Sequence, residues 1–235
     1  KNSIYSLNKN KIKLNKKIKL KNIKFSYDNN QIIFDQLNLV INQADKVFIT
    51  GDSGVGKSTL AEIICGIIDP STGSIIVDGK ILDLSKELLN RSYLPQKSFL
   101  LDDTIKKNIA LGLKDDEIDQ ARIDILLDIV DLKEFVASLK FGIDTKVGEL
   151  GNNLSGGQRQ RISLARALYF NPSILILDEA TNALDEKSET LVLNNLSNFF
   201  KNTTMIIISH NMNVLKICDK VIRISNGKIY IKKNN

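Results

Sequence analysis

Apolar residues recur in two patterns that divide the chain into predicted strands and helices. Short apolar runs bounded by polar turns are typical of β-strands, and they occur at 18–27, 37–41, 46–50, 74–77, 174–177, 204–208, 220–225 and 228–231. A polar turn is predicted at Asp28–Asn30. Helical spacing predicts helices at 57–67, 185–200 and 211–217. Strands that alternate with helices predict an α/β fold built on a parallel sheet.

The middle of the chain, from about Thr104 to Phe170, is dominated by helical spacing. One stretch predicts a single buried helix face; its apolar residues are Ile118, Ala121, Ile125, Leu126, Ile129 and Val130. We therefore expect a helical insert, at about residues 100–170, within the α/β fold. The sequence contains no internal repeat.

Positive charge is concentrated at the start of the chain. Over 235 residues, 33 Lys and Arg outnumber 27 Asp and Glu, which gives a net charge of +6. Eight lysines lie between Lys9 and Lys24. This composition predicts a solvated arm over residues 1–17. The rest of the chain is closer to neutral, which argues against a nucleic-acid partner.

The cysteines and the apolar runs exclude several protein classes. Cys65 and Cys218 are too few for a disulfide framework or a zinc site, and a reducing compartment is expected. Both have apolar neighbours, so we expect them in or near the core. No apolar run approaches the roughly 18–20 residues that a membrane-spanning helix needs.

The segment from Gly51 to Ser58 fits the pattern G-x-x-x-x-G-K-[ST] at every fixed position. A chance glycine turn is the alternative, but a predicted buried strand enters this segment and a predicted helix leaves it. Backbone N–H groups and a helix N-terminus suit a phosphate. The sequence therefore predicts a nucleoside triphosphate site made of Gly51, Asp52, Ser53, Gly54, Val55, Gly56, Lys57, Ser58 and Thr59. Lys57 would neutralise the β- and γ-phosphates, and Ser58 would bind Mg²⁺.

Two carboxylates follow the apolar run at 174–177. Asp178 and Glu179 must reach solvent or a cation, because burying an unpaired carboxylate is costly. An ordinary acidic turn at the end of a strand is the alternative. With the phosphate loop upstream, we predict that Asp178 binds Mg²⁺, directly or through water. Glu179 would act as the general base that activates an attacking water.

A third motif, Leu154–Arg161, opens a predicted helix and forms a second potential anion site. Its first polar residues and glycines are Ser155, Gly156, Gly157 and Gln158. One nucleotide needs only one phosphate cradle. With the phosphate loop and the run Leu177–Thr181, this octapeptide closely resembles that of the nucleotide-binding domains of ABC ATPases. The resemblance extends over about residues 18–232.

The resemblance implies the ABC ATPase fold, with a P-loop core, an antiparallel β subdomain and a helical subdomain. It also implies that ATP and Mg²⁺ are the cofactors and that residues 18–235 form one nucleotide-binding domain. In that family two domains pair head-to-tail, so the octapeptide of one covers the γ-phosphate of ATP on the other. A homodimer is therefore expected.

Four further residues match positions with roles in the family. Tyr27 is similar to the aromatic residue that stacks on adenine, and Gln96 to the glutamine that touches Mg²⁺ and couples to a membrane partner. Asp185 is similar to the acid of a loop that crosses the dimer interface. His210, the only histidine, is similar to the one that contacts the γ-phosphate. The alternatives are surface packing of Tyr27, a solvated amide at Gln96 and a structural role for His210.

Two residues depart from the family pattern. Asn182 stands where the interface loop usually begins with Ser, and Asn211 follows His210 where exporters commonly have Arg. We expect neither residue to touch the hydrolytic groups, so hydrolysis should be intact.

Two segments, Thr104–Ala110 and Thr145–Gly151, resemble stretches of ABC exporters that face the cytoplasmic ends of transmembrane helices. They imply the ATP-hydrolysing motor domain of an exporter or flippase, at the cytoplasmic face of a bacterial inner membrane. A transmembrane domain is expected upstream in the same chain, with residues 1–17 as the linker that follows it.

Two alternatives within the family remain open. One is a soluble ABC ATPase that acts on the ribosome or DNA. Ribosome-acting members usually carry two such domains, and chromosome-acting members insert long coiled coils between the phosphate loop and the octapeptide. The other is an importer subunit, although importers generally lack the segment seen here at 145–151.

Overall fold

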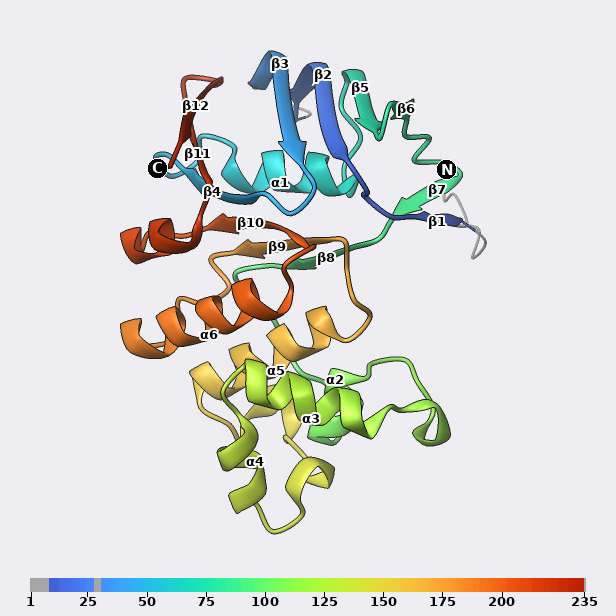
Figure 1. Ribbon diagram of the computed structural model, residues 1–235, viewed down its shortest axis with the longest axis vertical. Coiled ribbons are helices and arrows are strands. Elements are labelled where there is room, and N and C mark those ends of the chain that lie inside the picture. Colours follow the sequence, from blue (N-terminus) through green and yellow to red (C-terminus); the bar gives the residue numbers. More distant parts are fainter. Residues whose placement is uncertain (1–8, 28–30, 235) are drawn as a thin grey trace.

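The computed structural model describes residues 9–27 and 31–234, so the turn predicted at Asp28–Asn30 lies outside the described residues. Figure 1 shows a layered arrangement. Helix α1 (Lys57–Cys65) lies between a small antiparallel sheet and a larger sheet, and the remaining helices cover the other side of the larger sheet. One buried apolar cluster surrounds α1, and a second joins the larger sheet to the other helices.

The larger sheet brings the ends of its central strands to one edge. Its six strands have the order β12-β11-β4-β10-β9-β8. They are β4 (Lys46–Thr50), β8 (Arg91–Leu94), β9 (Ile174–Asp178), β10 (Thr204–Ile208), β11 (Lys220–Ser225) and β12 (Lys228–Lys233). All neighbours are parallel except β11 and β12. Every residue of β9 and β10 is buried, because both faces of the sheet are covered, and this explains their continuous apolar sequence.

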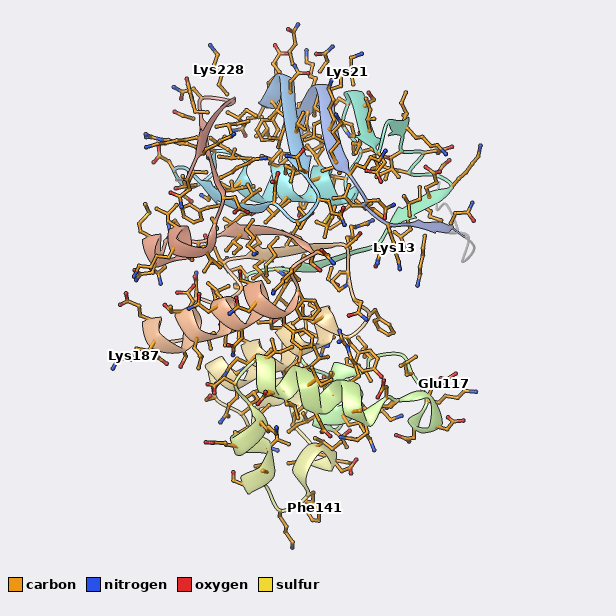
Figure 2. The ribbon with its side chains drawn as sticks, in the orientation of Figure 1. Lys13, Lys21, Glu117, Phe141, Lys187 and Lys228 are labelled. Carbon is orange, nitrogen blue, oxygen red and sulfur yellow. The ribbon has the colours of Figure 1, made fainter. Side chains whose placement is uncertain are left out.

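The antiparallel sheet covers the other side of α1. Its four strands have the order β3-β2-β5-β6. They are β2 (Lys17–Ser26), β3 (Ile32–Asn42), β5 (Thr72–Val77) and β6 (Lys80–Ile81). Residues of β2 alternate, so that Ile18 and Leu20 are buried while Lys21 is exposed on the side away from α1 (Figure 2). The alternation places the lysines of this strand in solvent.

The helical insert packs below the larger sheet (Figure 1). It contains α2 (Ile105–Ile109), α3 (Gln120–Ile129), α4 (Lys133–Ser138) and α5 (Gly156–Leu168), and α6 (Glu186–Phe199) packs against α3. Short 3₁₀ turns occur at Asp115–Glu117, Gly142–Asp144, Glu149–Gly151 and Met212–Ile217. The predicted α/β class with a helical insert is confirmed, although the helix predicted at 211–217 is a 3₁₀ turn.

The helix face predicted within 118–130 is partly wrong. α3 buries Ile123, Leu126 and Leu127, whereas Ile125 is 41% exposed and Ala121 also faces solvent. The sequence places apolar residues on two sides of this helix, and packing against α5 and α6 selects one of them. Helical spacing alone did not distinguish the two sides.

Some of the predicted solvated arm is folded. β1 (Asn10–Ile12) pairs in parallel with β7 (Glu87–Leu89), and Leu14 is only 2% exposed. Asp78 accepts hydrogen bonds from the backbone N–H groups of residues 15–17, at 2.8–2.9 Å. One buried leucine and these backbone bonds therefore fasten a segment whose composition is mostly lysine and asparagine.

The two cysteines lie in the core, as expected. Cys65 and Cys218 are both free and buried. Burial raises the pKa of each thiol to about 12, so both stay protonated near neutral pH. Across residues 9–27 and 31–234, every helix is too short or too polar to cross a membrane.

We predict that the Asp78 carboxylate stabilises the fold in a pH-dependent way. Burial alone would raise its pKa, but the three backbone hydrogen bonds prevail and lower it from the usual 3.8. The stabilisation of the folded state by the Asp78 carboxylate is therefore fully present at pH values above 3.8. It is lost as the pH falls through the lower pKa of the folded state. D78N should destabilise the fold by roughly 1 kcal/mol at pH 7, because the hydrogen bonds are partly screened by solvent.

The measurement is urea denaturation of both proteins at pH 7 and at pH 3. D35N, at an exposed aspartate of β3, is the control and should behave like the wild type. A D78N loss of equal size at both pH values would contradict the prediction.

Candidate functional site

An open cleft of about 560 Å³ lies where strands of the larger sheet end. Its lining comes from segments far apart in sequence and consists of Tyr27, Ile33, Ser53, Gly54, Gly56, Lys57, Ser58, Thr59, Gln96, Glu179 and His210. All of these except Ile33 are predicted site residues. The structure therefore brings most of the predicted nucleotide site together. Ile33 was missed, because it lies before the strand predicted at 37–41 and its apolar side chain gives no signal of a nucleotide site.

The phosphate loop joins β4 to α1. Gly56 is the N-cap of α1 with a φ of 100°, and no side chain caps the helix, so its first N–H groups are available to an anion. The Lys57 ammonium donates hydrogen bonds to the carbonyl oxygens of Gly51 and Asp52, at 3.0 and 2.9 Å. Gly51, Asp52 and Val55 belong to this loop without lining the cleft. Lys57 thus spans the loop and holds its charge beside the cleft.

The Glu179 carboxylate is the meeting point of three loops. Gln96 Nε2 donates a hydrogen bond to its Oε2 at 2.5 Å, and His210 Nε2 lies 3.1 Å from its Oε1. The side chain of Glu179 is 16% exposed, whereas that of His210 is 68% exposed. The backbone of Glu179 has a φ of 50°, in the sparsely populated left-handed region. Gln96, Glu179 and His210, predicted separately, thus form one polar cluster.

One expectation about the departures from the family pattern is wrong. Asn182 Nδ2 donates a hydrogen bond to Glu179 Oε2 at 3.1 Å, so Asn182 does touch the predicted hydrolytic carboxylate. A turn causes this contact, because the N–H of Asn182 bonds back to the carbonyl oxygen of Glu179. Asn211 makes no described hydrogen bond to Glu179.

Asp178 lies behind the cleft and is held by a residue that the sequence analysis missed. It is 6% exposed, and the Tyr93 hydroxyl donates a hydrogen bond to its Oδ2 at 2.8 Å. Burial, together with this bond, raises the pKa of Tyr93 well above its usual value, so the phenol stays a donor. Burial and the charge of Asp178 also raise the pKa of Glu62 on α1. The aromatic position in the segment before Gln96 is the one sequence signal that could have pointed to Tyr93.

The three predicted metal ligands differ in placement. Ser58 and Gln96 line the cleft, and Asp178 does not. Their hydroxyl, amide and carboxylate oxygens are the donors that Mg²⁺ prefers. Among the residues that the structure describes, no three or more His, Cys, Asp or Glu side chains are grouped to hold a metal ion. This donor set fits an ion that is shared with a phosphate chain better than an ion held by protein alone.

Tyr27 presents a large aromatic surface at the cleft. Its side chain is 49% exposed, and its hydroxyl lies 2.9 Å from the Thr59 hydroxyl oxygen. The rings of Phe25 and Tyr27 form a T-shaped pair, with centroids 4.9 Å apart. The ring of Tyr27 is therefore fixed at one side of the phosphate loop, where a planar base could stack on it.

The predicted octapeptide begins α5, away from the phosphate loop. Ser155 is the N-cap, its hydroxyl accepts a hydrogen bond from the Gln158 N–H, and Gln158 Oε1 accepts one from the Ser155 N–H. Gly156 and Gly157 pack beside residues 183–184, where a Cβ on Gly157 would lie 3.2 Å from a leucine methyl. No described residue of 155–158 lines the cleft. One chain thus holds the octapeptide apart from the phosphate loop.

Asp185 also lies outside the cleft. It caps the N-terminus of α6 by accepting hydrogen bonds from the backbone N–H groups of Lys187 and Ser188, both at 3.1 Å. The hydrogen bonds from Ser188 lower the pKa of Asp185. The residues just before it, 183–184, touch the start of α5, so this loop and the octapeptide form one continuous surface.

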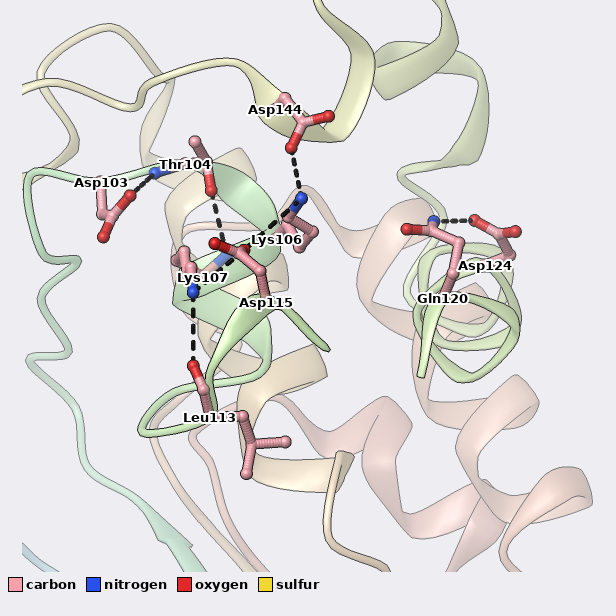
Figure 3. A network of polar contacts seen from close by, with 9 residues as sticks. All are labelled: Asp103, Thr104, Lys106, Lys107, Leu113, Asp115, Gln120, Asp124 and Asp144. Atoms are coloured by element: carbon pink, nitrogen blue, oxygen red, sulfur yellow. Dashed lines mark hydrogen bonds and ion pairs between the residues drawn. The ribbon is translucent and has the colours of Figure 1, made fainter. Parts of the chain in front are cut away.

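The two exporter-like segments pack against each other in the helical insert. Backbone hydrogen bonds join Thr104–Ala110 to Thr145–Gly151. Figure 3 shows Lys106 placed between Asp144, at 2.7 Å, and Asp115, at 3.8 Å. The hydrogen bond to Asp144 raises the pKa of Lys106. The fold therefore brings two separate sequence segments together within the helical insert.

A groove of about 330 Å³ lies after β8, beside the segment Thr104–Ala110. Its lining is mostly apolar and consists of Ser92, Tyr93, Leu94, Pro95, Lys97, Ser98, Phe99, Leu111, Ser163, Arg166, Ala167 and Phe170. Phe99 is 64% exposed and Phe170 is 58% exposed. Arg166 donates a hydrogen bond to the carbonyl oxygen of Phe99 at 3.0 Å and so holds the wall of the groove. Gln96 lies in the same segment, between this groove and the cleft.

Comparison with known proteins identifies one family. Residues 34–182 match the family described as ABC transporter. The alpha-hemolysin translocation ATP-binding protein HlyB of Escherichia coli O157:H7 is 42% identical over 216 residues, covering 90% of this chain and 30% of that protein. The ATP-dependent lipid A-core flippase of Ralstonia nicotianae is 36% identical over 217 residues, covering 90% of this chain and 37% of that protein.

A solved structure is similar as well. A bacterial Atm1-family ABC exporter with ATP bound has a TM-score of 0.85 and 32% sequence identity, covering 95% of this chain and 40% of that chain. The chain therefore spans 30–40% of the lengths of these three proteins.

We predict that two glycines of the phosphate loop differ in their tolerance of alanine. Both have positive φ, so alanine should cost about 1–2 kcal/mol at either position. A Cβ on Gly54 would meet nothing within 4 Å, whereas a Cβ on Gly56 would lie 2.5 Å from Ile33 Cγ2. G56A should therefore lose a further 1–3 kcal/mol or so through overpacking. Urea denaturation measures both, and equal losses would contradict the prediction.

Proposed function

Since the chain belongs to the ABC transporter family, we propose that it is the motor domain of an exporter or flippase and works as a head-to-tail pair. Membership confirms the ABC ATPase fold, ATP as the nucleotide and ATP hydrolysis as the activity. One observation carries the proposal. The cleft contains the phosphate loop and the Glu179 carboxylate, which Gln96 and His210 both contact. The octapeptide of the same chain does not line this cleft.

In the proposed binding step, ATP takes over contacts that the loop now makes to itself. Lys57 would exchange the carbonyl oxygens of Gly51 and Asp52 for the β- and γ-phosphates, while the N–H groups at the start of α1 bind the same phosphates. Tyr27 would stack on the adenine ring, with its hydroxyl fixed near Thr59. Each of these groups lines the cleft or lies in the loop beside it.

Ser58, Gln96 and Asp178 would hold Mg²⁺ together with the phosphates. The ion, when bound, neutralises charge that develops on the phosphate oxygens. Gln96 would turn from Glu179 toward the nucleotide, because its amide nitrogen now donates to that carboxylate. Tyr93 would keep the Asp178 carboxylate in one orientation.

For hydrolysis we propose Glu179 as the general base and His210 as a contact to the γ-phosphate. The two side chains lie 3.1 Å apart, so a water beside Glu179 would also be close to a phosphate held by His210. The Asn182 amide, which donates to Glu179 Oε2 at 3.1 Å, limits the rotation of Glu179 after Gln96 has turned away. Such restriction keeps the base aimed at the cleft.

The proposed closed state needs a second copy of the domain. Ser155, Gly156, Gly157 and Gln158 offer a hydroxyl, N–H groups and a helix N-terminus, yet they do not reach the cleft of their own chain. Across a head-to-tail pair they would cover the γ-phosphate bound by the partner, with Asp185 in the loop between the domains. ATP would then bridge the pair, and phosphate release would open it.

The exporter assignment rests on the groove and on the two exporter-like segments, Thr104–Ala110 and Thr145–Gly151. A transmembrane domain is the partner that we propose for the groove, with Phe99 and Phe170 exposed to receive it. This chain covers 30% and 37% of the two curated relatives, which are named for translocation and for flipping. We therefore propose an upstream membrane domain in the same chain, a location at the cytoplasmic face of a bacterial inner membrane, and no nucleic-acid partner.

We predict that E179Q binds ATP but hydrolyses it slowly. Loss of the general base should lower kcat by about 100- to 10,000-fold, while the phosphate loop is unchanged. The ATP-bound pair should accumulate, because the step that opens it is blocked. Light scattering after size exclusion in ATP and Mg²⁺ should show a dimer for E179Q. E134Q, at an exposed glutamate of α4, is the matched control. If E179Q stays monomeric in millimolar ATP and Mg²⁺, the proposed head-to-tail pairing of two domains is wrong.

We predict that the groove is needed for transport and dispensable for ATP hydrolysis by the isolated domain. F99A with F170A should leave the ATPase activity of the domain within about twofold of the wild type, because neither residue lines the cleft. In the protein that includes the membrane domain, the same changes should abolish ATP-dependent transport by removing apolar contact area. F199A, at an exposed phenylalanine of α6, is the control. Normal transport by the double variant would refute this assignment of the groove.

A further inference from the structure

We propose that Glu189 is a positioning residue that ties together the two loops carrying Glu179 and His210. The inference rests on the proposed function and goes beyond it, because it gives a role to a side chain that does not line the cleft. Glu189 lies in the first turns of α6 and is only 5% exposed. Its two carboxylate oxygens serve different loops.

One oxygen serves the loop after β9. The Thr181 hydroxyl donates a hydrogen bond to Glu189 Oε1 at 2.6 Å, and Thr181 itself is 2% exposed. Thr181 is two residues beyond Glu179. The contact therefore fixes the backbone that leaves Glu179, where the φ of 50° needs support from its surroundings.

The other oxygen serves the loop after β10. Asn211 Nδ2 donates a short hydrogen bond to Glu189 Oε2, and Asn211 directly follows His210. A second link lies beside it, because Asn213 Nδ2 donates to Glu186 Oε1 on the same helix. The N-terminal end of α6 is thus bonded to both loops, and it can hold their separation.

No ion pair with a described Lys or Arg compensates the carboxylate of Glu189. No Lys or Arg of the part of the chain that the structure describes forms a salt bridge with it, and both bonds come from neutral donors. A buried carboxylate requires such donors, and the N-terminal end of α6 adds favourable electrostatics. An apolar residue at position 189 would fill the same space with a smaller desolvation cost. The distinctive feature of Glu189 is therefore that its two carboxylate oxygens accept hydrogen bonds from two different loops.

The consequence is that Glu189 fixes the relative positions of Glu179 and His210 from the side of the loops that faces away from the cleft. Their side chains lie 3.1 Å apart in the cleft, and the N–H of Glu179 bonds to the carbonyl oxygen of Ile208. Those contacts join the loops at the front. Without the Glu189 contacts at the back, the two loops could move separately while the phosphate loop stayed unchanged.

The test removes one hydroxyl and keeps the shape of the side chain. T181V should lower kcat for ATP hydrolysis by about ten- to a hundredfold, the range expected for a displacement of the order of 1 Å in a catalytic group. KM for ATP should stay within twofold, because the phosphate loop is untouched. T181S retains the hydroxyl and should restore kcat.

T203V is the matched control, since Thr203 is a buried threonine whose hydroxyl donates to the carbonyl oxygen of Pro172 at 3.1 Å. It removes one buried hydroxyl bond elsewhere, and it should shift the urea midpoint about as much as T181V while leaving kcat unchanged. Equal kcat for T181V and the wild type, or an equal kcat loss in T203V, would overturn the inference. If the wild type itself did not hydrolyse ATP, the proposed function would fail, and the inference with it.

Discussion

Burial of both faces of the six-stranded sheet is the constraint on which the rest of the structure depends. β9 and β10 are buried along their whole length, so a polar side chain can meet solvent or ligand only where these strands end. Because β4, β9 and β10 run parallel, their ends share one edge. The phosphate loop, the acidic pair and His210 follow these strands directly. The polar residues of the cleft are therefore confined to this edge, because unpaired polar side chains are costly to bury in the interior.

The two buried clusters divide the molecule into regions with different contacts. The cluster around α1 supports the phosphate loop from both sides, and Gly56 is packed against β3. The other cluster supports the helical insert, which carries the octapeptide and the apolar groove. Gln96 and Glu179 touch each other at the junction. A change in how the insert is held would therefore reach the nucleotide cleft through the contact of Gln96 with Glu179 and through the loop at 182–184, which joins α5 to Glu179.

The sequence predicted those features that depend on short-range pattern. The strand before Asp178 was recognisable because burial on both faces demands an unbroken apolar run, and the phosphate loop because its glycines and lysine have fixed spacing. Leu14 and β1 were missed, since a single apolar residue among lysines has no periodicity. The buried side of α3 was predicted only in part, because packing against α5 and α6 decided between two apolar sides. The contacts of Asn182 with Glu179 and of Tyr93 with Asp178 depend on side-chain reach across turns and strands, which spacing does not encode.

The parallel pairing of β1 with β7, followed by the three backbone bonds to Asp78, also has a mechanical meaning. Tension applied along β1 would load the bonds of that small ladder in shear, so that they would resist together rather than break in succession. The load would pass next to Asp78, at the turn between β5 and β6, and into the antiparallel sheet. From there it would act on α1 through the apolar cluster that both share. A force applied at the amino-terminal side would therefore act on the antiparallel sheet and α1 together. It would not act directly on the phosphate loop.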